Sequence, residues 1–274
     1  MSVYEDWVGR SQTATDVLDP ARSNALDVAL GGAGALTAGE ALPLLDHWLH
    51  FWDVKPPAAL GTDGHPAKGG FLPPVPLPRR MWAGGRLTFL QPLHLGETVT
   101  RTSTITAVTE KAGKSGTLVF VTVRHELDAG GGIAVREEQD LVYRDPAPGV
   151  LPLPIAIPVP DAAWAETVAP DPVLLFRYSA LTMNGHRIHY DRPYAMGEES
   201  YPALVVHGPL QAALLIRLAG KALGRPVTGF DFRGQQPAFD GIPLHVCGNV
   251  TDQGGEFWTQ QAEAKNMVAT VRTA

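Results

Sequence analysis

The chain has 274 residues, of which 45% are hydrophobic and 18% charged, so it can bury a core and its composition excludes a disordered protein. Its formal net charge of -6 argues against nucleic acid and against an anionic membrane surface as partners. Its single cysteine excludes an internal disulfide and a cysteine-based zinc site, and we expect Cys247, in a strand-like stretch, to be buried. We expect no signal peptide and no membrane span, and therefore a cytoplasmic protein.

The first half of the chain predicts one helix followed by an antiparallel meander. Asp19 and the proline after it are a good cap and first turn for a helix over 19–30. The segment 42–52 fits a strand or a short helix equally well. Proline and glycine crowd the segment 56–78, which predicts irregular structure, and so long a loop is usually functional. Alternating patterns predict strands over 86–90, 98–108, 118–127 and 134–143, with turn residues at 111–116.

A proline-rich stretch separates this half from a second one with a similar plan. We expect a first half at 1–145, an extended linker at 146–165 and a second half at 166–274. The segment 204–223 is apolar all round, which is typical of a helix buried inside a sheet. Strands are predicted over 173–178, 228–235, 244–250 and 257–271.

One local register recurs in the two halves. Pro92 and Gly96 precede one predicted strand, and Pro237 and Gly241 precede another, with both offsets equal to 145 residues. Together with the shared order of helix and then meander, this match indicates a duplication. We therefore expect a sheet curled around one apolar helix, present twice.

The densest cluster of polar functional groups lies at 184–191. His189 can take or give a proton near neutral pH, and Asn184 offers both a donor and an acceptor that could orient a water molecule. A capped turn with ordinary surface histidines, including His186, is the structural alternative, and the residue types alone leave both open.

A second cluster, Val205-Val-His-Gly-Pro209, opens the apolar helix. Backbone amides at a helix N-terminus lack partners and favour negative charge, and Gly208 would let a ligand carbonyl approach closely. A plain helix cap with proline in the first turn is the alternative, and it stays open on these residues.

Both clusters together resemble the MaoC-like (R)-specific enoyl-CoA hydratases. Asn184 and His189 are five positions apart, as are the Asp and His of that family's motif, and His207-Gly208 recurs on the central helix. The resemblance implies an α+β double hot-dog fold, with two antiparallel sheets each wrapped around a central apolar helix. It also implies a hydro-lyase that adds or removes water across an acyl-CoA double bond, with the Gly208 N–H facing the thioester oxygen.

The segment Asn184-Gly-His-Arg-Ile-His-Tyr-Asp191 is most similar to one branch of this family. That branch contains the mitochondrial-type hydroxyacyl-thioester dehydratases and the mesaconyl- and itaconyl-CoA hydratases, and residues 61–86 resemble its N-terminal half. The family's Asp is Asn184 here, and Asn cannot act as a carboxylate base. We therefore expect His189 to be the main acid and base and Asn184 to position the water, while His186 hydrogen-bonds one of them or holds the turn.

The resemblance also implies the ligand and its contacts. We expect a short acyl-CoA of four or five carbons, for which a dicarboxyl group such as mesaconyl or itaconyl is one option, with coenzyme A as part of the substrate and no separate cofactor. His186-x-x-His189 lacks a third ligand of clear spacing, so no metal is expected. The first half is expected to be catalytically silent and to shape the acyl pocket. Candidate substrate-binding residues are His186, His207, Arg187, Arg79 and Arg80.

Arg79 and Arg80 have two interpretations. One of them could bind the far carboxylate of a dicarboxyl acyl group, or the two could be an exposed pair bound to Asp or Glu. Three other functions stay open: a dehydratase of fatty-acid synthesis, a hot-dog thioesterase and a non-catalytic acyl-CoA binder. Pairing of two chains into a homodimer is also left open.

Overall fold

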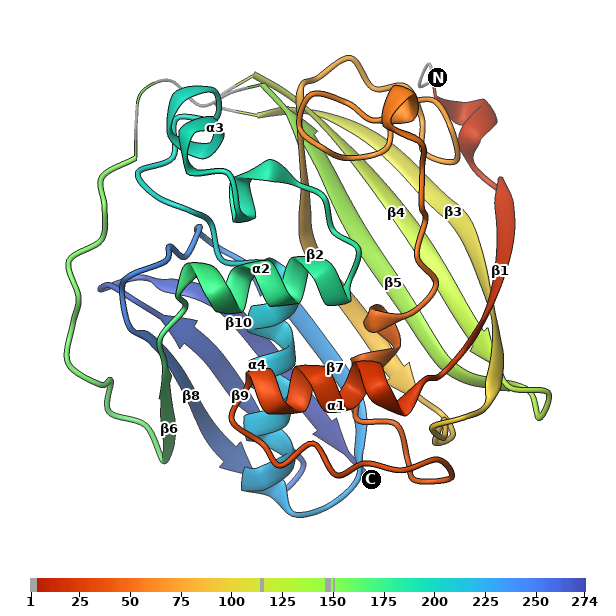
Figure 1. Cartoon of the computed structure of the whole chain (residues 1–274), viewed down its shortest axis with the longest axis vertical. Coiled ribbons are helices and arrows are strands. Elements are labelled where there is room, and N and C mark those ends of the chain that lie inside the picture. Colours follow the sequence, from red (N-terminus) through yellow and green to blue (C-terminus); the bar gives the residue numbers. More distant parts are fainter. Residues whose placement is uncertain (1–3, 114–115, 146–148, 150) are drawn as a thin grey trace.

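The strands of the chain form one continuous sheet, and the helices gather on one face of it (Figure 1). The structure, a computed structural model, describes residues 4–113, 116–145, 149 and 151–274. Within these residues the strands are β1 (Ser11–Val17), β2 (Arg79–Phe89), β3 (Thr98–Gly113), β4 (Gly116–Asp128), β5 (Ile133–Arg144), β6 (Trp164–Val168), β7 (Val227–Gly234), β8 (Leu244–Thr251), β9 (Gly254–Gln260) and β10 (Lys265–Thr273). The helices are α1 (Pro20–Ala29), α2 (Pro172–Leu181), α3 (Arg192–Gly197) and α4 (Gly208–Leu223), with short 3-10 helices η1 (Glu5–Trp7), η2 (Asp46–Leu49), η3 (Pro57–Ala59) and η4 (Arg187–His189).

The strand order shows the duplication directly. The sheet runs β1-β3-β4-β5-β2-β7-β10-β9-β8-β6, and every pair of neighbours is antiparallel. Each half therefore has the order first, third, fourth, fifth, second, and the two halves meet edge to edge at β2 and β7. Pairing at this junction leaves neither of these strands with a free edge.

Two glycines let the halves approach closely at that junction. A Cβ at Gly84 would lie 2.5 Å from the carbonyl oxygen of Phe232, and one at Gly85 would lie 2.8 Å from the ring of the same phenylalanine. Both distances are shorter than real Cβ contacts allow, so only glycine fits at either position.

Equivalent hydrogen bonds in the two halves confirm the repeated register. The amide of Gly96 donates to the carbonyl of Leu18 at 2.7 Å, and the amide of Gly241 donates to that of Pro170 at 3.1 Å. Both glycines have positive φ, 90° and 77° respectively, as tight turns before a strand require. Two more hydrogen bonds from amide to carbonyl correspond: Leu95 to Glu40 matches Asp240 to Leu204, and Leu42 to Leu93 matches Val206 to Ala238. The β-bridge between Ala41 and His94 likewise matches the one between Val205 and Phe239.

Helices α1 and α2 are also counterparts, and they pack side by side across the front of the molecule (Figure 1). Each follows the edge strand of its half and begins with an Asp-Pro pair. The carboxylate of Asp19 accepts a hydrogen bond from the amide of Ala21, and that of Asp171 accepts one from Leu174. The helix predicted over 19–30 is confirmed. The strand predicted over 173–178 is wrong, because this cap starts a helix, α2, that includes these residues.

The central helices of the two halves differ. In the second half α4 is wrapped by β6 to β10, as the apolar pattern predicts, although the helix starts at Gly208 and not at 204. In the first half, Leu42 is the counterpart of Val206, which lies just before α4. The segment that follows Leu42 holds only the single turn η2 where the second half has α4. Leu45 and Leu49 of this region are buried, and Val75 of the long irregular segment fills a further part of the inner face. A full central helix is therefore present once, and in the first half one turn and a loop replace it.

Other local differences have simple causes. The stretch 257–271 is a hairpin of β9 and β10, and β3 continues to Gly113 through the predicted turn residues. The edge strands β1 and β6 escape prediction because both are mostly exposed and show no apolar alternation. The linker expected at 146–165 has no helix or strand over 151–163, while β6 begins at Trp164. The division into halves at 145 and 166 stays a prediction.

Two expectations from composition can be compared with the structure. Cys247 is fully buried on β8, as its strand-like surroundings predict. Among the described helices, none is long and apolar enough to cross a membrane.

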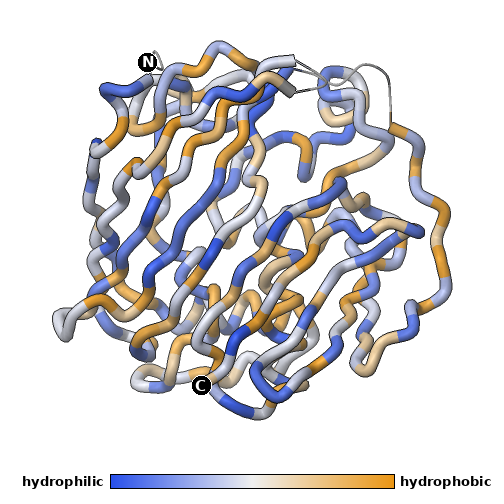
Figure 2. Tube along the Cα trace, turned by 180° about the vertical axis from the view of Figure 1, so that it is seen from behind, coloured by the Kyte–Doolittle hydropathy of each residue, from blue (hydrophilic) through white to orange (hydrophobic). Residues whose placement is uncertain are grey.

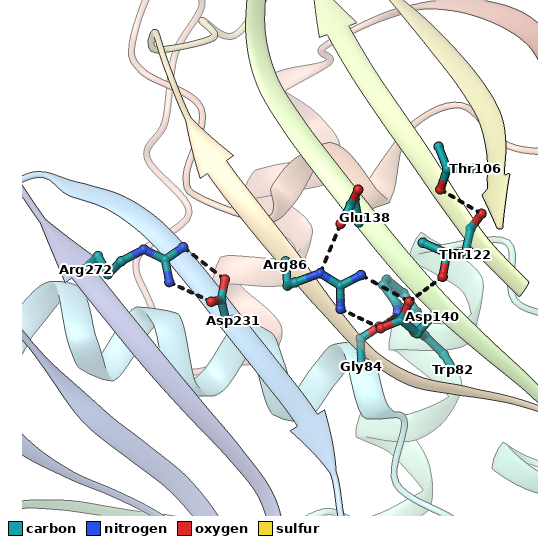
Figure 3. Close-up of polar contacts among 9 residues, drawn as sticks. All are labelled: Trp82, Gly84, Arg86, Thr106, Thr122, Glu138, Asp140, Asp231 and Arg272. Carbon is teal, nitrogen blue, oxygen red and sulfur yellow. Dashed lines mark hydrogen bonds and ion pairs between the residues drawn. The ribbon is translucent and has the colours of Figure 1, made fainter. Parts of the chain in front are cut away.

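The outer face of the sheet is polar and held by cross-strand ion pairs. Seen from behind, the sheet lies in front, and hydrophilic and hydrophobic residues alternate along its strands (Figure 2). Arg86 of β2 contacts both Asp140 and Glu138 of β5, and Arg272 of β10 pairs with Asp231 of β7 (Figure 3). These pairs are about half exposed, so each contributes only about 0.2–1 kcal/mol to the free energy of unfolding.

Candidate active site

The predicted catalytic segment leaves α2 through a tight turn. Met183 adopts the left-handed conformation with φ 50°, and the amide of Asn184 donates to the carbonyl of Ser179 at 2.8 Å. The chain then enters η4, which carries His189. The amide of Val205, just before α4, donates to the carbonyl of Ile188, so the segment returns beside the start of the central helix.

His189 is held as a neutral base. Its Nδ1 lies 2.7 Å from the carbonyl oxygen of Val205, and because a carbonyl only accepts, Nδ1 carries the proton and Nε2 presents a lone pair. The side chain is 7% exposed. Burial lowers the pKa of His189 to about 4, although the hydrogen bond to Val205 opposes this shift. Near neutral pH the ring can therefore accept a proton from water.

His207 lies directly against this base. Its ring stacks on that of His189 with centroids 3.7 Å apart and an angle of 18° between the planes. Nε2 of His207 is 2.8 Å from the Ser179 hydroxyl, and the side chain is fully buried. Burial and the neighbouring histidines hold the pKa of His207 well below its usual range, so both stacked rings are neutral.

Gly208 begins α4 immediately after His207. Among the described residues its amide makes no hydrogen bond. A Cβ placed on Gly208 would meet only the methyl carbon of Met267, at 3.8 Å. The positive end of this buried helix thus lies beside His207 and His189, which suits an oxygen that gains negative charge.

Asn184 and His186 complete the second-half loop. The Asn184 side-chain oxygen accepts a hydrogen bond from the His186 amide at 3.0 Å, and its NH₂ group is available to a water molecule. The ring of His186 stands perpendicular to that of His189, with centroids 5.4 Å apart. Burial, the largest cause, lowers the pKa of His186 to about 2.

The structure adds two residues that the sequence reasoning did not select as site residues, Asp63 and His65. Both come from the long irregular segment of the first half. His65 Nδ1 lies 2.9 Å from the Asp63 carboxylate, and the ring of His65 is 4.2 Å from that of His186. The only local signal was an Asp-Gly-His triplet in a proline-rich loop, which does not show what the loop touches.

A cavity of about 730 Å³ lies between the two halves beside these residues. Three of the predicted arginines line it, Arg79, Arg80 and Arg187, and they differ in their ion-pair partners. Arg79 is buried and paired with Glu199, whereas Arg187 pairs with Asp191. Arg80 has no ion pair among the described residues, although its charge helps to lower the pKa of His65. Arg80 is therefore the one of these three arginines without a carboxylate partner among the described residues, and its guanidinium acts on the hydroxyl of Tyr143. The cavity is lined by Gly61, Thr62, Asp63, His65, Pro66, Ala67, Lys68, Pro76, Pro78, Arg79, Arg80, Arg187, Tyr194, Glu198 and Glu199.

Folding also brings two potential metal ligands, Asp63 and His65, to His186, whereas His189 is not part of this group. Ligand atoms of Asp63, His65 and His186 all lie within 4.8 Å of one another. The charge of Arg80 acts on both of these histidines, so the surroundings disfavour a cation.

The chain is similar to known proteins over most of its length. The family described as hydroxyacyl-thioester dehydratase type 2 matches residues 45–240. The chain is 48% identical over 242 residues to mesaconyl-C4-CoA hydratase of Chloroflexus aurantiacus, which covers 88% of this chain and 86% of that protein. It is 30% identical over 239 residues to the mitochondrial hydroxyacyl-thioester dehydratase type 2 of Schizosaccharomyces pombe, with 77% and 78% covered.

Solved structures agree with the fold. A MaoC-like dehydratase superposes with a TM-score of 0.71 at 16% identity, covering 99% of each chain. A Mycobacterium tuberculosis protein described as a double hot-dog superposes with a TM-score of 0.55 at 15% identity, covering 97% of this chain and 96% of that one. The predicted α+β double hot-dog fold is confirmed.

Proposed function

The chain belongs to the type 2 hydroxyacyl-thioester dehydratase family and is a hydro-lyase of acyl-CoA thioesters, and from this premise we propose that its substrate is a short unsaturated acyl group with a second carboxylate, of the mesaconyl type. The observation that carries the proposal is Arg80. It is a half-buried arginine in the cavity shared by both halves, without an ion pair among the described residues. An unpaired guanidinium in such a place favours a carboxylate ligand. The identity to a mesaconyl-C4-CoA hydratase supports the same choice.

The chemistry follows from His189 and the Gly208 amide, which lie together at the start of α4. The cavity reaches this segment at Arg187. His189 Nε2 takes a proton from water, and the water oxygen bonds to C3 of the acyl group. The electron pair of the C2–C3 double bond moves to the thioester oxygen, where the Gly208 amide and the helix N-terminus stabilise the charge. A proton then reaches C2 as the carbonyl re-forms. Dehydration is the same sequence in reverse.

The charged lining of the cavity disfavours one of the three alternatives, the dehydratase of fatty-acid synthesis, and experiment distinguishes the other two. A dehydratase of fatty-acid synthesis would need an apolar continuation for a longer chain, whereas Lys68, Arg80 and Asp63 line this cavity. A thioesterase would release free thiol, and a non-catalytic binder would change no ester. We propose a cytoplasmic enzyme without a separate cofactor, and pairing into a homodimer stays a prediction.

A panel of CoA esters tests the proposal. Crotonyl-, mesaconyl-, itaconyl- and a medium-chain enoyl-CoA are followed by the loss of conjugated-thioester absorbance, with a thiol dye in a parallel sample. Mesaconyl- or itaconyl-CoA should be hydrated with the highest kcat/KM, and no thiol should appear. A preference for the medium-chain ester would reject the proposed substrate class, and thiol release would reject hydration.

A further inference from the structure

The catalytic segment of the second half has no carboxylate at position 184. Asn184 stands there, and its side-chain oxygen accepts a hydrogen bond from the amide of His186. Hydration requires a group that removes a proton from water and a group that delivers one to C2. His189 supplies one of these functions, and no ionisable side chain at 184 supplies the other.

The loop of the first half is fixed against the catalytic segment of the second. A Cβ at Gly64 would lie 2.0 Å from the carbonyl oxygen of Gly185, so the two backbones touch where both residues are glycine. The Arg187 amide donates to the Asp63 carbonyl at 2.9 Å, and its guanidinium donates to Thr62 at 3.0 Å. These contacts define the position of the Asp-Gly-His triplet relative to His189.

Within this loop Asp63 and His65 form an oriented pair. The carboxylate accepts the proton on Nδ1 of His65, which leaves Nε2 for another partner, and a second hydrogen bond joins the His65 amide to the same carboxylate at 3.0 Å. His65 lines the cavity. Its ring lies 4.2 Å from that of His186, which lies 5.4 Å from that of His189, and the charges of His65 and His189 affect each other.

We infer that His65 is the second acid and base of the site, taking the place of the missing carboxylate, and that Asp63 is its positioning residue. This inference rests on the proposed hydration and gives the first half a catalytic role, in contrast to the sequence-based expectation that it is silent. In hydration His65 starts as the imidazolium and His189 as the neutral base. His189 takes a proton from water while the C3–O bond forms, and His65 gives its Nε2 proton to C2. Dehydration starts from the opposite protonation of the two rings.

The surroundings favour this role over a metal site at the same three residues. Burial, the largest cause, lowers the pKa of His65, and the charge of Arg80 lowers it further, whereas Asp63 stabilises the imidazolium form. Arg80 and Lys68 line the same cavity with positive charge. An acyl carboxylate bound at Arg80 would offset that positive charge and favour protonation of His65. A divalent cation would instead add to it.

The test compares variants of the full chain on whichever CoA ester the unaltered protein hydrates. His65→Gln should lower kcat about 10²- to 10⁴-fold with little change in KM. His65→Ala should recover part of the lost rate when imidazole is added, because the residue opens onto the cavity. His94→Gln, which changes an exposed histidine of the same half, is the matched control and should leave the rate unchanged. Thermal unfolding identifies any variant that fails to fold.

The pH dependence of the Asp63→Asn variant distinguishes a catalytic role of His65 from a purely structural one. Loss of the carboxylate lowers the pKa of His65, so the pH optimum for hydration should shift to lower pH. An unchanged rate and pH profile in His65→Gln would overturn the inference, as would loss of activity with a chelator and recovery with a divalent metal ion. Failure of the unaltered chain to hydrate any ester would instead reject the proposed function itself.

Discussion

The rings of His189 and His207 stack at 3.7 Å with nearly parallel planes, and neither ring lies on the surface. A proton on either ring would place a buried charge against the other. Both rings therefore stay neutral near pH 7, and the hydrogen bond from Nδ1 of His189 to Val205 leaves its Nε2 as the acceptor.

Replacing this acceptor should abolish most of the activity. His189→Gln keeps a polar group of similar length but cannot take a proton from water, so kcat should fall about 10²- to 10⁴-fold. Steady-state hydration of the preferred CoA ester measures the change, and His94→Gln is again the control. A kcat within a factor of three of the unaltered value would remove His189 from the chemistry.

Gly208→Ala distinguishes the contribution of the Gly208 amide to catalysis from its contribution to stability. The added methyl group meets only Met267, and alanine is favoured over glycine in helices, so the free energy of unfolding should be unchanged or higher by up to about 1 kcal/mol. The same methyl group would occupy the approach of the thioester oxygen, and kcat should fall about 10²-fold.

The matched control for this change lies in the same helix. Gly220→Ala adds a methyl group where nothing lies within 4 Å, far from the amide that opens α4. It should leave kcat unchanged. Equal kcat values in the two alanine variants would show that the Gly208 amide does not contact the substrate.

Arg80→Met tests the substrate carboxylate. It should lower kcat/KM on mesaconyl- or itaconyl-CoA about 10- to 100-fold, the effect of losing one charged hydrogen bond, while sparing crotonyl-CoA. Equal losses on both kinds of ester would reject the carboxylate role.

The neighbouring arginine should behave differently. Arg79 is buried against Glu199 and stacks over Tyr201, so Arg79→Met should destabilise the protein by about 3 kcal/mol by leaving the glutamate unpaired. Denaturant unfolding measures this change. Substrate preference should stay as in the unaltered chain.

Buried histidines should make the fold sensitive to acid. Burial lowers the pKa of His125 to about 4, whereas the unfolded residue titrates near pH 6.5. Between these values the unfolded state binds the extra proton, so the free energy of unfolding falls by about 1.4 kcal/mol per pH unit for each such residue as the pH decreases. Asp46, whose pKa burial raises to about 6, contributes a slope of opposite sign.

A comparison with His125→Gln isolates one of these contributions. Urea unfolding at several pH values between 4.5 and 6.5 should give a slope smaller by about 1.4 kcal/mol per pH unit in the variant. The contribution of Asp46 is common to both proteins and cancels in the difference. Parallel pH dependences would mean that His125 is already protonated in the folded protein.

Local patterns were sufficient for much of this fold. The Asp19-Pro cap and the apolar 204–223 pattern predicted α1 and α4, and alternation predicted most of the strands. The segment 173–178 was too short and too apolar for its period to separate strand from helix. The polar edge strands β1 and β6 carry no such signal, because their stability comes from pairing with β3 and β8.

Only the site residues that lie within short sequence motifs were predictable. Asn184, His186, His189 and Gly208 lie in two short motifs, which the family resemblance connects. His65 reaches them through the close approach of Gly64 and Gly185, a tertiary contact between residues more than a hundred positions apart. No spacing within either half encodes that contact.

The shortened central helix of the first half has a consequence for how the enzyme can diversify. Two complete helices would have made the halves interchangeable, each with its own half-sized pocket. With one helix reduced to the turn η2, the loop that follows it is freed to reach across to the partner half and form one wall of a single, larger pocket. Changes in that wall can alter which acyl groups are accepted, while His189 and the start of α4, which do not line this cavity, keep the reaction the same.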